Sequence, residues 1–352
     1  MEKIRVLHIL QSNQFSGAEN VVCQIIDMYK NSAQIEMAYC SPDGQIHEIL
    51  QKKGVLFFPL SQLSVKNLRN VINQYQPKII HAHDASASVI ATLVNRKLHI
   101  VSHIHGNHLN MRKISVKAVL VKELSRYWSK IIWVSESAYR DYKFSKSVKN
   151  KSIILQNIIL KEDLEKKLKS DESEYFFDCI VLGRINKIKN PLRALSIFEK
   201  VIKIIPTFKV AFVGNGDLLD RCIQYINEHH MEENIKFLGY MNNPIKVLAG
   251  SKLLVMTSIY EGTPICALEA MGMGVPIVST PTDGILDLVL QDKTGFYSDD
   301  DNELAERIVS ILSDKELYLT MKSATLRRFD QMMNVDLYKS KLSAVYDEAL
   351  KG

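Results

Sequence analysis

The sequence has few cysteines, and no two of them form a CxxC pair. The five cysteines, which are Cys23, Cys40, Cys179, Cys222 and Cys266, are odd in number and far apart in the chain. This pattern argues against a disulfide framework and a zinc knuckle, and it fits a reducing compartment. Internal repeats and low-complexity tracts are also missing from the 352 residues, so we expect ordinary globular domains.

Long apolar runs are missing as well. No stretch approaches the roughly 18 uninterrupted apolar residues of a membrane-spanning helix. The N-terminus, MEKIRVLHIL, enters a predicted strand directly, without the apolar segment and small-residue cleavage site of a secretory signal. We therefore expect a cytoplasmic protein that spans no membrane.

Acidic residues are scarce in one segment. Between Arg112 and Lys151 there are eleven lysines and arginines but only three acidic residues. Two interpretations stay open. The charges form a solvated face, or they attract an anionic partner such as a membrane surface, which would place the protein on the inner face of the plasma membrane. The overall net charge of +6 is modest, and we expect no nucleic acid partner.

Strand and helix patterns alternate along most of the chain, on both sides of a charged segment over 156–175. Such alternation predicts an α/β protein with doubly wound parallel sheets. We expect two domains of this class, an N-terminal domain over 1–157 and a second domain over 158–334. The last helical segment, 335–352, has no following strand and is expected to pack back on the first domain.

Residues 260–280, YEGTPICALEAMGMGVPIVST, show the clearest local pattern. They predict a loop, a helix that starts at Pro264 after a Thr263 cap, and then a buried strand. Glu261 precedes this helix and Glu269 lies within it. Because a helix N-terminus presents free N–H groups, it can hold a phosphate between these two carboxylates.

Two cations follow another predicted strand end. Arg184 and Lys189 lie in GRINKIKNP, after a predicted strand over 176–182 and before a helix that opens at Pro191. Ligands of open α/β sheets bind at the carboxyl ends of the strands, so the two cations predict an anion clamp. Solvated loop charges are the alternative. An anion clamp would suit the departure of a nucleoside diphosphate, which needs either fixed cations or a metal ion.

The sequence does not favour a metal site. Asp299 and Asp301 form a DxD pattern, but they open a predicted helix, where acidic residues favour the dipole, so we interpret them as capping residues. The histidines of HAHD and HIHG have a spacing of two, which places alternate residues of any strand end on one face. Catalysis or substrate binding is the favoured role for these imidazoles, and His105 beside Gly106 is the best candidate.

Together these motifs resemble those of a known family. EGTPICALE resembles the E-x7-E element of retaining glycosyltransferases of the GT4 type, and FSGAE resembles their N-terminal GGxE loop. HIHG is similar to their HxHG segment, and GRINKIKN to their GRLxxxKN segment. The resemblance implies the GT-B fold, in which two Rossmann-like domains face each other across a cleft. It also implies retention at the anomeric carbon, with no metal and no other cofactor.

The resemblance further implies roles for individual residues. The donor-binding residues would be Gly17, Arg184, Lys189, Gly262, Thr263, Pro264, Ile265 and Glu269. Among them, Glu269 would bind the ribose hydroxyls. Glu261 would touch the donor sugar and His105 would lie by the reacting centre, so these two are the catalytic candidates. The candidates for the acceptor side are His83, Asp84 and Asn107.

Three departures from the family pattern are visible. Ser16 replaces the first glycine of GGxE, and Asn157-Ile158 replaces the usual Asn-Gly hinge. The family's Gly-Gly-x-Pro-Glu stretch is reduced to Thr282-Asp283-Gly284, which we interpret as a mark of a different donor or acceptor.

We therefore expect a glycosyltransferase that moves a sugar from a UDP- or GDP-linked donor to a glycan or lipid-linked acceptor. The synthesis of bacterial capsule, exopolysaccharide or lipopolysaccharide is the expected setting. Two alternatives stay open. One is another reaction of the GT-B fold, that of a nucleotide-sugar 2-epimerase or a phosphorylase. The other is a non-catalytic scaffold that only binds a nucleotide sugar.

Overall fold

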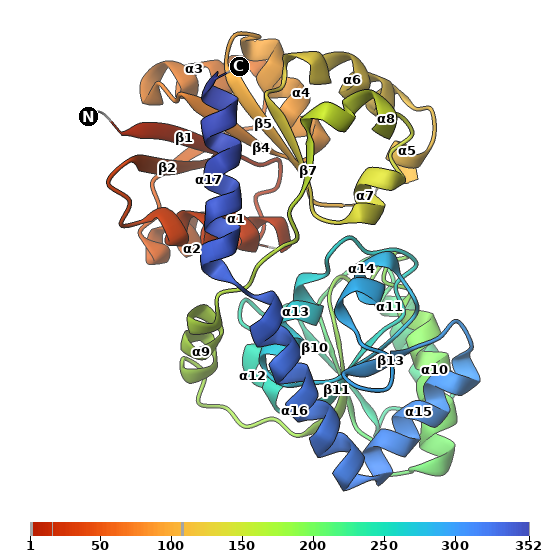
Figure 1. Cartoon of the computed structure of the whole chain (residues 1–352). Coiled ribbons are helices and arrows are strands. Elements are labelled where there is room, and N and C mark those ends of the chain that lie inside the picture. The colour runs from red at the N-terminus through yellow and green to blue at the C-terminus, as the bar shows by residue number, and fades with distance from the viewer. Residues whose placement is uncertain (1–2, 16, 107–108, 352) are drawn as a thin grey trace. The chain divides into compact units, whose positions relative to one another are not determined.

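The computed structural model describes residues 3–15, 17–106 and 109–351. The chain forms two compact units, each with its own sheet and covering helices (Figure 1). Unit 1 contains residues 1–158 and 335–352, and unit 2 contains residues 159–334. The division lies one residue from the domain boundary that the sequence predicts. The two parallel sheets confirm the predicted α/β class.

Unit 1 has a seven-stranded sheet in the order β3-β2-β1-β4-β5-β6-β7, and all neighbouring strands are parallel. The strands are β1 (Ile4–Ile9), β2 (Ile35–Pro42), β3 (Phe57–Leu60), β4 (Ile79–His83), β5 (His99–Ile104), β6 (Lys130–Trp133) and β7 (Ser152–Ile154). The order reverses between β1 and β4, and the carboxyl ends of strands at such a reversal form the usual ligand position of doubly wound sheets.

The helices of unit 1 cover both faces of this sheet (Figure 1). They are α1 (Gly17–Tyr29), α2 (Ile46–Lys53), α3 (Val65–Tyr75), α4 (Asp84–Val94), α5 (Leu109–Arg112), α6 (Val116–Leu124), α7 (Glu136–Arg140), α8 (Ser145–Val148) and α17 (Val335–Lys351). Helix α5 is followed by a break before α6, and α6 continues into a short 3-10 turn over Ser125–Tyr127. Ser115 ends the break because its hydroxyl accepts a hydrogen bond from the N–H of Ala118 and caps α6.

Helix α17 returns to unit 1 and buries an apolar stripe there. Tyr338, Leu342, Val345 and Tyr346 are all buried, at the spacing of one helix face. Polar contacts add to this packing, because the hydroxyl of Tyr29 in α1 donates to the carbonyl of residue 339 at 3.1 Å. The C-terminal helix is therefore part of the core of unit 1.

Unit 2 has a six-stranded parallel sheet in the order β10-β9-β8-β11-β12-β13. The strands are β8 (Phe177–Leu182), β9 (Val210–Val213), β10 (Ile235–Gly239), β11 (Ser251–Met256), β12 (Ile277–Ser279) and β13 (Gly295–Tyr297). The helices are α9 (Lys161–Lys169), α10 (Pro191–Ile204), α11 (Leu219–Glu228), α12 (Ile245–Ala249), α13 (Ile265–Gly272), α14 (Asp283–Leu288), α15 (Asp301–Ser313) and α16 (Lys315–Met332).

The charged segment over 156–175 contains a helix that the sequence pattern did not predict. Leu164 is the one fully buried residue of α9, and it reaches the core beside Gly272, where an added Cβ would lie 2.4 Å from its side chain. A single buried residue in nine gives no apolar periodicity, so the sequence pattern did not indicate a helix here. No helix in the described part of the chain is long and apolar enough to cross a membrane.

Candidate functional site

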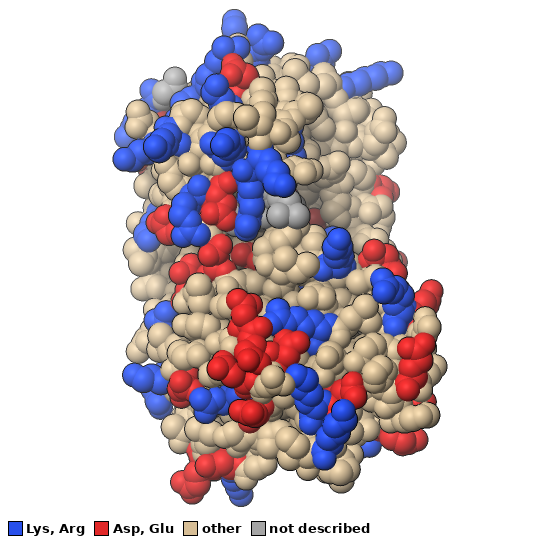
Figure 2. Space-filling view, turned by 90° about the vertical axis from the view of Figure 1, so that its right-hand side faces the viewer, with Lys and Arg blue, Asp and Glu red and all other residues tan. Residues whose placement is uncertain are grey.

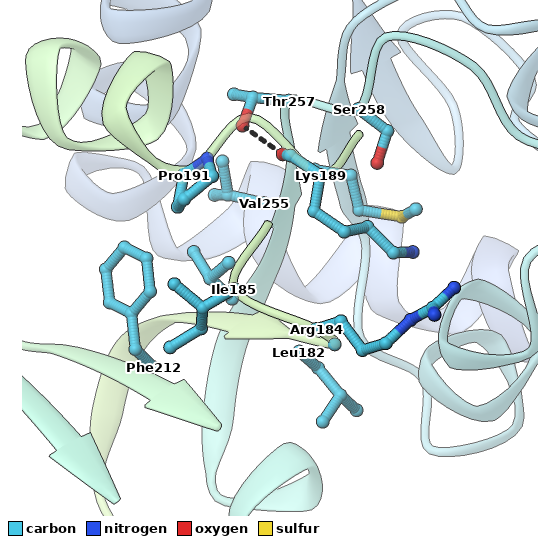
Figure 3. Close-up of a pocket in the computed structure, with 12 residues that line it drawn as sticks. Leu182, Arg184, Ile185, Lys189, Pro191, Phe212, Val255, Thr257 and Ser258 are labelled. Atoms are coloured by element: carbon cyan, nitrogen blue, oxygen red, sulfur yellow. Dashed lines mark hydrogen bonds between the residues drawn. The ribbon is translucent and has the colours of Figure 1, made fainter. Parts of the chain in front are cut away.

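A pocket lies at the carboxyl ends of β8 and β11 in unit 2 (Figure 3). Its lining residues are Val181, Leu182, Gly183, Arg184, Ile185, Lys189, Pro191, Phe212, Val255, Met256, Thr257 and Ser258. In Figure 3 the side chains of Arg184 and Lys189 extend toward the same side of the pocket. The two cations that the sequence singled out therefore share one site.

The loop that carries Lys189 is held by hydrogen bonds at both ends. The side-chain oxygen of Asn186 accepts from the N–H groups of Ile188 and Lys189, both at 3.1 Å. The hydroxyl of Thr257, directly after β11, donates to the carbonyls of Lys189 at 3.2 Å and Asn190 at 2.9 Å. The backbone at Lys189 is thus held in place, so only the side chain of Lys189 determines where its ammonium lies.

Lys189 and Glu261 form a close ion pair. The Lys189 Nζ donates to Oε1 of Glu261 at 2.6 Å, and the hydroxyl of Ser258 donates to the same oxygen at 2.6 Å. Burial opposes the charge on Lys189, but the carboxylate of Glu261 more than offsets this effect and raises the pKa of the lysine. Lys189, which we expect to bind phosphate, and Glu261, which we expect to bind the donor sugar, are therefore in direct contact.

Arg184 contrasts with Lys189. Its side chain is exposed, and its guanidinium has no hydrogen-bond acceptor among the residues that the structure describes. The charge of Lys189 is matched by Glu261, so the arginine contributes the net positive charge of this pocket. A planar guanidinium can bind two phosphate oxygens at once.

Two glycines in VGNGD allow the neighbouring turn to approach the Arg184 loop. A Cβ on Gly214 would lie 1.9 Å from the carbonyl oxygen of Gly183, and one on Gly216 would lie 2.2 Å from that of Ile185. In the structure the glycines of this turn serve close backbone packing that supports the pocket.

Helix α13 begins one residue later than predicted. Pro264 is its N-cap residue, with φ −70° and ψ 120°, and no side chain caps the helix there. Thr263 is therefore not the cap, because the extended backbone of Pro264 separates it from the first turn. The N–H of Ala267 donates to the Pro264 carbonyl at 3.1 Å, so the N–H groups of Ile265 and Cys266, which precede this bond, are the ones suited to an anion.

The loop before α13 is supported by α14. Gly284, in the first turn of α14, lies so close to Gly262 that a Cβ at position 284 would be 1.6 Å from the Gly262 carbonyl oxygen. The same Cβ would be 2.9 Å from the ring of Pro264. The shortened Thr282-Asp283-Gly284 stretch thus retains a glycine where one is sterically required.

Glu269 occupies a different environment from Glu261. Its side chain is only 8% exposed, and burial raises its pKa to about 7. Nearby Lys167 lowers this pKa and Asp163 raises it. The carboxyl group of Glu269 is therefore close to half ionised near neutral pH.

The DxD pattern contributes to a helix start and an ion pair. The side chain of Asp300, the residue between the two, accepts from the N–H of Asn302 and caps α15. Asp301 accepts from Nε of Arg193 at 2.7 Å. The capping residue is therefore Asp300, and not Asp299 or Asp301 as the sequence pattern suggested; Asp301 lies in the first turn of α15.

In unit 1, buried histidines gather at the carboxyl ends of β1, β4 and β5. His8 lies opposite His81 in the strand register, and His83 lies opposite His103. The Nδ1 of His83 and the Nε2 of His105 are 2.7 Å apart. The sequence did not single out His8, because it stands alone in its strand.

Asp84 supports the loop of His105. It has a left-handed backbone with φ 71°, which is unfavourable for a residue with a side chain. Its carboxylate accepts a hydrogen bond from the N–H of His105 at 3.1 Å. Such local strain occurs frequently at functional sites.

The remaining candidates of unit 1 are His83 and Asn107 on the acceptor side and the segment of Ser16 and Gly17 on the donor side. His83 is only 2% exposed and both its ring nitrogens are hydrogen-bonded within unit 1, so it supports His105 and does not face an acceptor in this structure. Asn107 and Ser16 lie outside the described residues. Gly17 is the first residue of α1.

Sequence reasoning missed Ser258 and Thr280 in unit 2. Ser258 binds Glu261, and the hydroxyl of Thr280 donates to the carbonyl of Ser258 at 2.7 Å. Each follows the end of a strand, β11 and β12 respectively. Position after a predicted strand was therefore a signal that could have identified both.

Comparison with known proteins agrees with this arrangement. Residues 161–328 match the family described as glycosyl transferases group 1. An uncharacterized glycosyltransferase of Methanocaldococcus jannaschii is 24% identical over 253 residues, which is 65% of this chain and 62% of that protein. The UDP-Gal:alpha-D-GlcNAc-diphosphoundecaprenol alpha-1,3-galactosyltransferase of Escherichia coli is 23% identical over 355 residues and 91% of each chain.

The fold has solved counterparts. The crystal structure of Anabaena Alr3699/HepE in complex with UDP-glucose superposes with a TM-score of 0.82 at 20% identity. It covers 97% of this chain and 99% of that chain. These findings agree with the resemblance that the motifs indicated: residues 161–328, most of unit 2, match the group 1 glycosyltransferases, and the chain as a whole has the GT-B fold.

Proposed function

We propose that this enzyme transfers a sugar, with retention at the anomeric carbon and without a metal ion, from a UDP-linked donor that unit 2 binds. The observation that carries the proposal is the Lys189–Glu261 pair at 2.6 Å, with Ser258 on the same carboxylate and Arg184 exposed beside it. This cluster holds cations, a carboxylate and a hydroxyl at the ends of β8 and β11. UDP is favoured over GDP because several similar structures, among them Anabaena HepE, contain UDP or UDP-glucose.

Each side chain has a distinct role in this proposal. Arg184, Lys189 and the N–H groups of Gly262, Thr263 and Ile265 hold the diphosphate and stabilise its charge as it leaves. Glu261 binds the donor sugar and Glu269 binds the ribose. The bond between the anomeric carbon and the phosphate oxygen breaks, a bond from an acceptor hydroxyl forms on the same face of the sugar, and the proton of that hydroxyl passes to the departing diphosphate.

We assign His105 to the sugar substrate and unit 1 to the acceptor. The acceptor is a glycan or lipid-linked sugar, because the similar galactosyltransferase of Escherichia coli acts on a sugar diphosphoundecaprenol. Bacterial surface polysaccharide synthesis is the pathway that this proposal favours.

The test is sugar transfer with a panel of UDP- and GDP-sugars, with and without EDTA. We expect Glu261→Ala to lower kcat about a hundredfold or more, since it removes a group that contacts the reacting sugar. Glu232→Ala, at an exposed carboxylate of unit 2, is the matched control and should leave kcat unchanged. Full transfer by Glu261→Ala, or a loss of activity in EDTA that divalent ions restore, would contradict the proposal.

The same assay separates the alternatives. Epimerised nucleotide sugar in the absence of an acceptor would favour a 2-epimerase, and phosphate-dependent cleavage would favour a phosphorylase. Tight nucleotide binding without any turnover would favour a scaffold.

We also propose that unit 1 docks on an anionic membrane through the start of α6. Ile114 and Val116 are 72% and 79% exposed, and Lys113 and Lys117 flank them. Lysines and arginines are abundant on the face of unit 1 that Figure 2 shows. Apolar side chains that insert and cations that meet lipid phosphates together favour binding at a bilayer surface.

Not every cation of the basic segment is available to lipid. The Nζ of Lys151 donates to three backbone carbonyls, those of Ser125, Arg126 and Trp128, at 2.7 to 3.1 Å. Arg112 pairs with Asp141 at 3.2 Å. Part of the excess charge that the sequence shows is therefore structural.

Vesicle flotation tests this surface. We expect the protein to float with vesicles that contain phosphatidylglycerol, and the Ile114→Asp/Val116→Asp variant to remain in the bottom fraction. Leu319→Asp, at an apolar residue of unit 2 that is 48% exposed, is the matched control and should still float. Equal flotation of both variants would rule out docking through this surface, and failure of the unaltered protein to float would rule out membrane binding.

A further inference from the structure

Five imidazoles of unit 1 form one buried cluster. His8 comes from β1, His81 and His83 from β4, His103 from the end of β5, and His105 follows that strand. The first four are at most 2% exposed. Their ring centroids are separated by 4.1 to 5.3 Å between neighbours.

Three of these rings form a hydrogen-bonded row that ends at His105. The Nδ1 of His8 lies 2.9 Å from the Nε2 of His83, and the Nδ1 of His83 lies 2.7 Å from the Nε2 of His105. The centroids along this row are 5.2 and 5.0 Å apart, with interplanar angles of 24° and 26°. The rings therefore meet edge to edge through their nitrogens.

A second row lies against the first. The hydroxyl of Tyr346 in α17 bonds to Nδ1 of His81 at 2.8 Å, and Nε2 of His81 lies 3.2 Å from Nδ1 of His103. His103 stacks on His105, with their centroids 4.1 Å apart. One face of the His105 ring is thus packed against His103, while its Nε2 edge is bonded to His83.

The protonation states within the row depend on one another. Burial lowers the pKa of His8, His83 and His105. At His105 the carboxylate of Asp84 acts in the opposite direction and offsets part of this lowering. A neutral imidazole has one N–H and one lone pair, so each ring of the row donates on one side and accepts on the other. The tautomer of His105 therefore follows from that of His83, and that of His83 from His8.

The row uses only one of the two ring nitrogens of His105. Its Nδ1 is buried and has no hydrogen-bond partner among residues 3–15, 17–106 and 109–351. A buried polar atom without a partner is unfavourable, and such an atom in a native structure points to a functional role.

We propose that His83 is a positioning residue for His105: it holds the ring and its tautomer so that Nδ1 is the nitrogen that meets the substrate, and His8 holds His83. This inference rests on the proposed role of His105 in glycosyl transfer. The spacing within the row fits shared protons better than a shared metal ion. Two nitrogens on a tetrahedral zinc ion lie about 3.3 Å apart, which is more than either distance in the row.

Two substitutions at one position separate the two contacts of His83. In His83→Asn the amide nitrogen is attached at the same carbon as Nδ1, so it can still bond to His105. In His83→Gln the longer amide takes the place of Nε2 and bonds to His8, while His105 loses its partner. Tyr346→Phe is the matched control, because it removes a hydrogen bond from the second row only.

The measurement is the ¹⁵N chemical shift of the His105 ring in the full chain labelled with ¹⁵N-histidine, assigned with a His105→Gln variant. We expect one His105 tautomer in the unaltered protein, in His83→Asn and in Tyr346→Phe, and a mixture in His83→Gln. In sugar transfer, His83→Gln should lower kcat about ten- to a hundredfold with the donor KM within about threefold, and His83→Asn should restore kcat.

Three results would overturn the inference: an unchanged tautomer in His83→Gln, mixed tautomers in the unaltered protein, or a stoichiometric metal in the purified protein. The ring shifts need no turnover. If the ring shifts are as expected but no sugar transfer occurs, the proposed function is wrong, while the inferred positioning of His105 by His83 stands.

Discussion

Glu261 and Glu269 stand eight residues apart but have different electrostatic surroundings. Glu261 accepts hydrogen bonds from Lys189 and Ser258, so its charge is matched directly. Glu269 is buried in the apolar core around α13, where the loss of hydration raises its pKa to about 7. At the scale of single residues, the surroundings of the Glu261 carboxylate are dominated by an ion pair, and those of Glu269 by burial.

This difference predicts that donor binding depends on pH. A carboxylate accepts hydrogen bonds from ribose hydroxyls better than a neutral carboxyl group does, and Glu269 gains its proton as the pH falls through about 7. We expect the Kd of UDP-glucose to rise about tenfold between pH 8 and pH 6 in calorimetric titration.

The Glu269→Gln variant is the control for this titration. It should bind UDP-glucose weakly and with little dependence on pH in the same range. An equal slope in the variant would assign the titration to another group. A flat profile in the unaltered protein would exclude Glu269 from ribose binding.

Helix α14 shapes the loop before α13 through a single glycine. Gly284 approaches the carbonyl of Gly262 so closely that no side chain fits between them. The backbone conformation of the proposed phosphate loop is therefore set by the packing of two short elements.

We expect Gly284→Ala to displace the 262–264 loop. The added methyl group would lie 1.6 Å from the Gly262 oxygen, so the loop or the helix must shift. Overpacking of this kind destabilises by about 1–3 kcal/mol, and thermal unfolding should report a lower Tm. UDP-glucose binding should also weaken more than Tm alone explains.

Leu286→Ala is the matched control in the same helix, because Leu286 is 45% exposed. It should leave both Tm and binding nearly unchanged. If Gly284→Ala bound UDP-glucose with normal affinity, the loop would not depend on this contact.

At the scale of the whole molecule, the two units contain buried titratable groups of opposite kind. Unit 1 buries His8, His81, His83 and His103, whose pKa values lie below the ordinary 6.5 because of burial. The unfolded chain binds protons at these histidines that the folded unit excludes, so stability decreases as the pH falls below about 6.5. Burial of Glu269 in unit 2 acts in the opposite direction, since stability decreases as the pH rises from about 4.5 to 7.

Tryptophan fluorescence can follow the first of these effects alone. Both tryptophans, Trp128 and Trp133, are buried in unit 1. We expect the urea midpoint seen by fluorescence to fall between pH 7 and pH 5. The His8→Gln/His103→Gln variant should show a smaller fall, and an unchanged midpoint in the unaltered protein would contradict the prediction.

Much of the site could be predicted from single segments of sequence. Arg184 and Lys189 follow one strand, Glu261 follows another, and the pattern around Pro264 indicated a helix start. These features are local, because they depend on apolar periodicity and on residues with special backbone preferences. The helix start was wrong by one residue, since the extended Pro264 backbone is a matter of the loop's packing.

By itself, the sequence determined the alternation of strands and helices, the two sheets and the side chains at the strand ends. Only the tertiary structure decided which of these side chains meet. Lys189 and Glu261 are 72 residues apart in the chain, and His8 and His83 are 75 apart. Their contact depends on strand order and register in a parallel sheet, where neighbours are joined through long crossovers that no local pattern records.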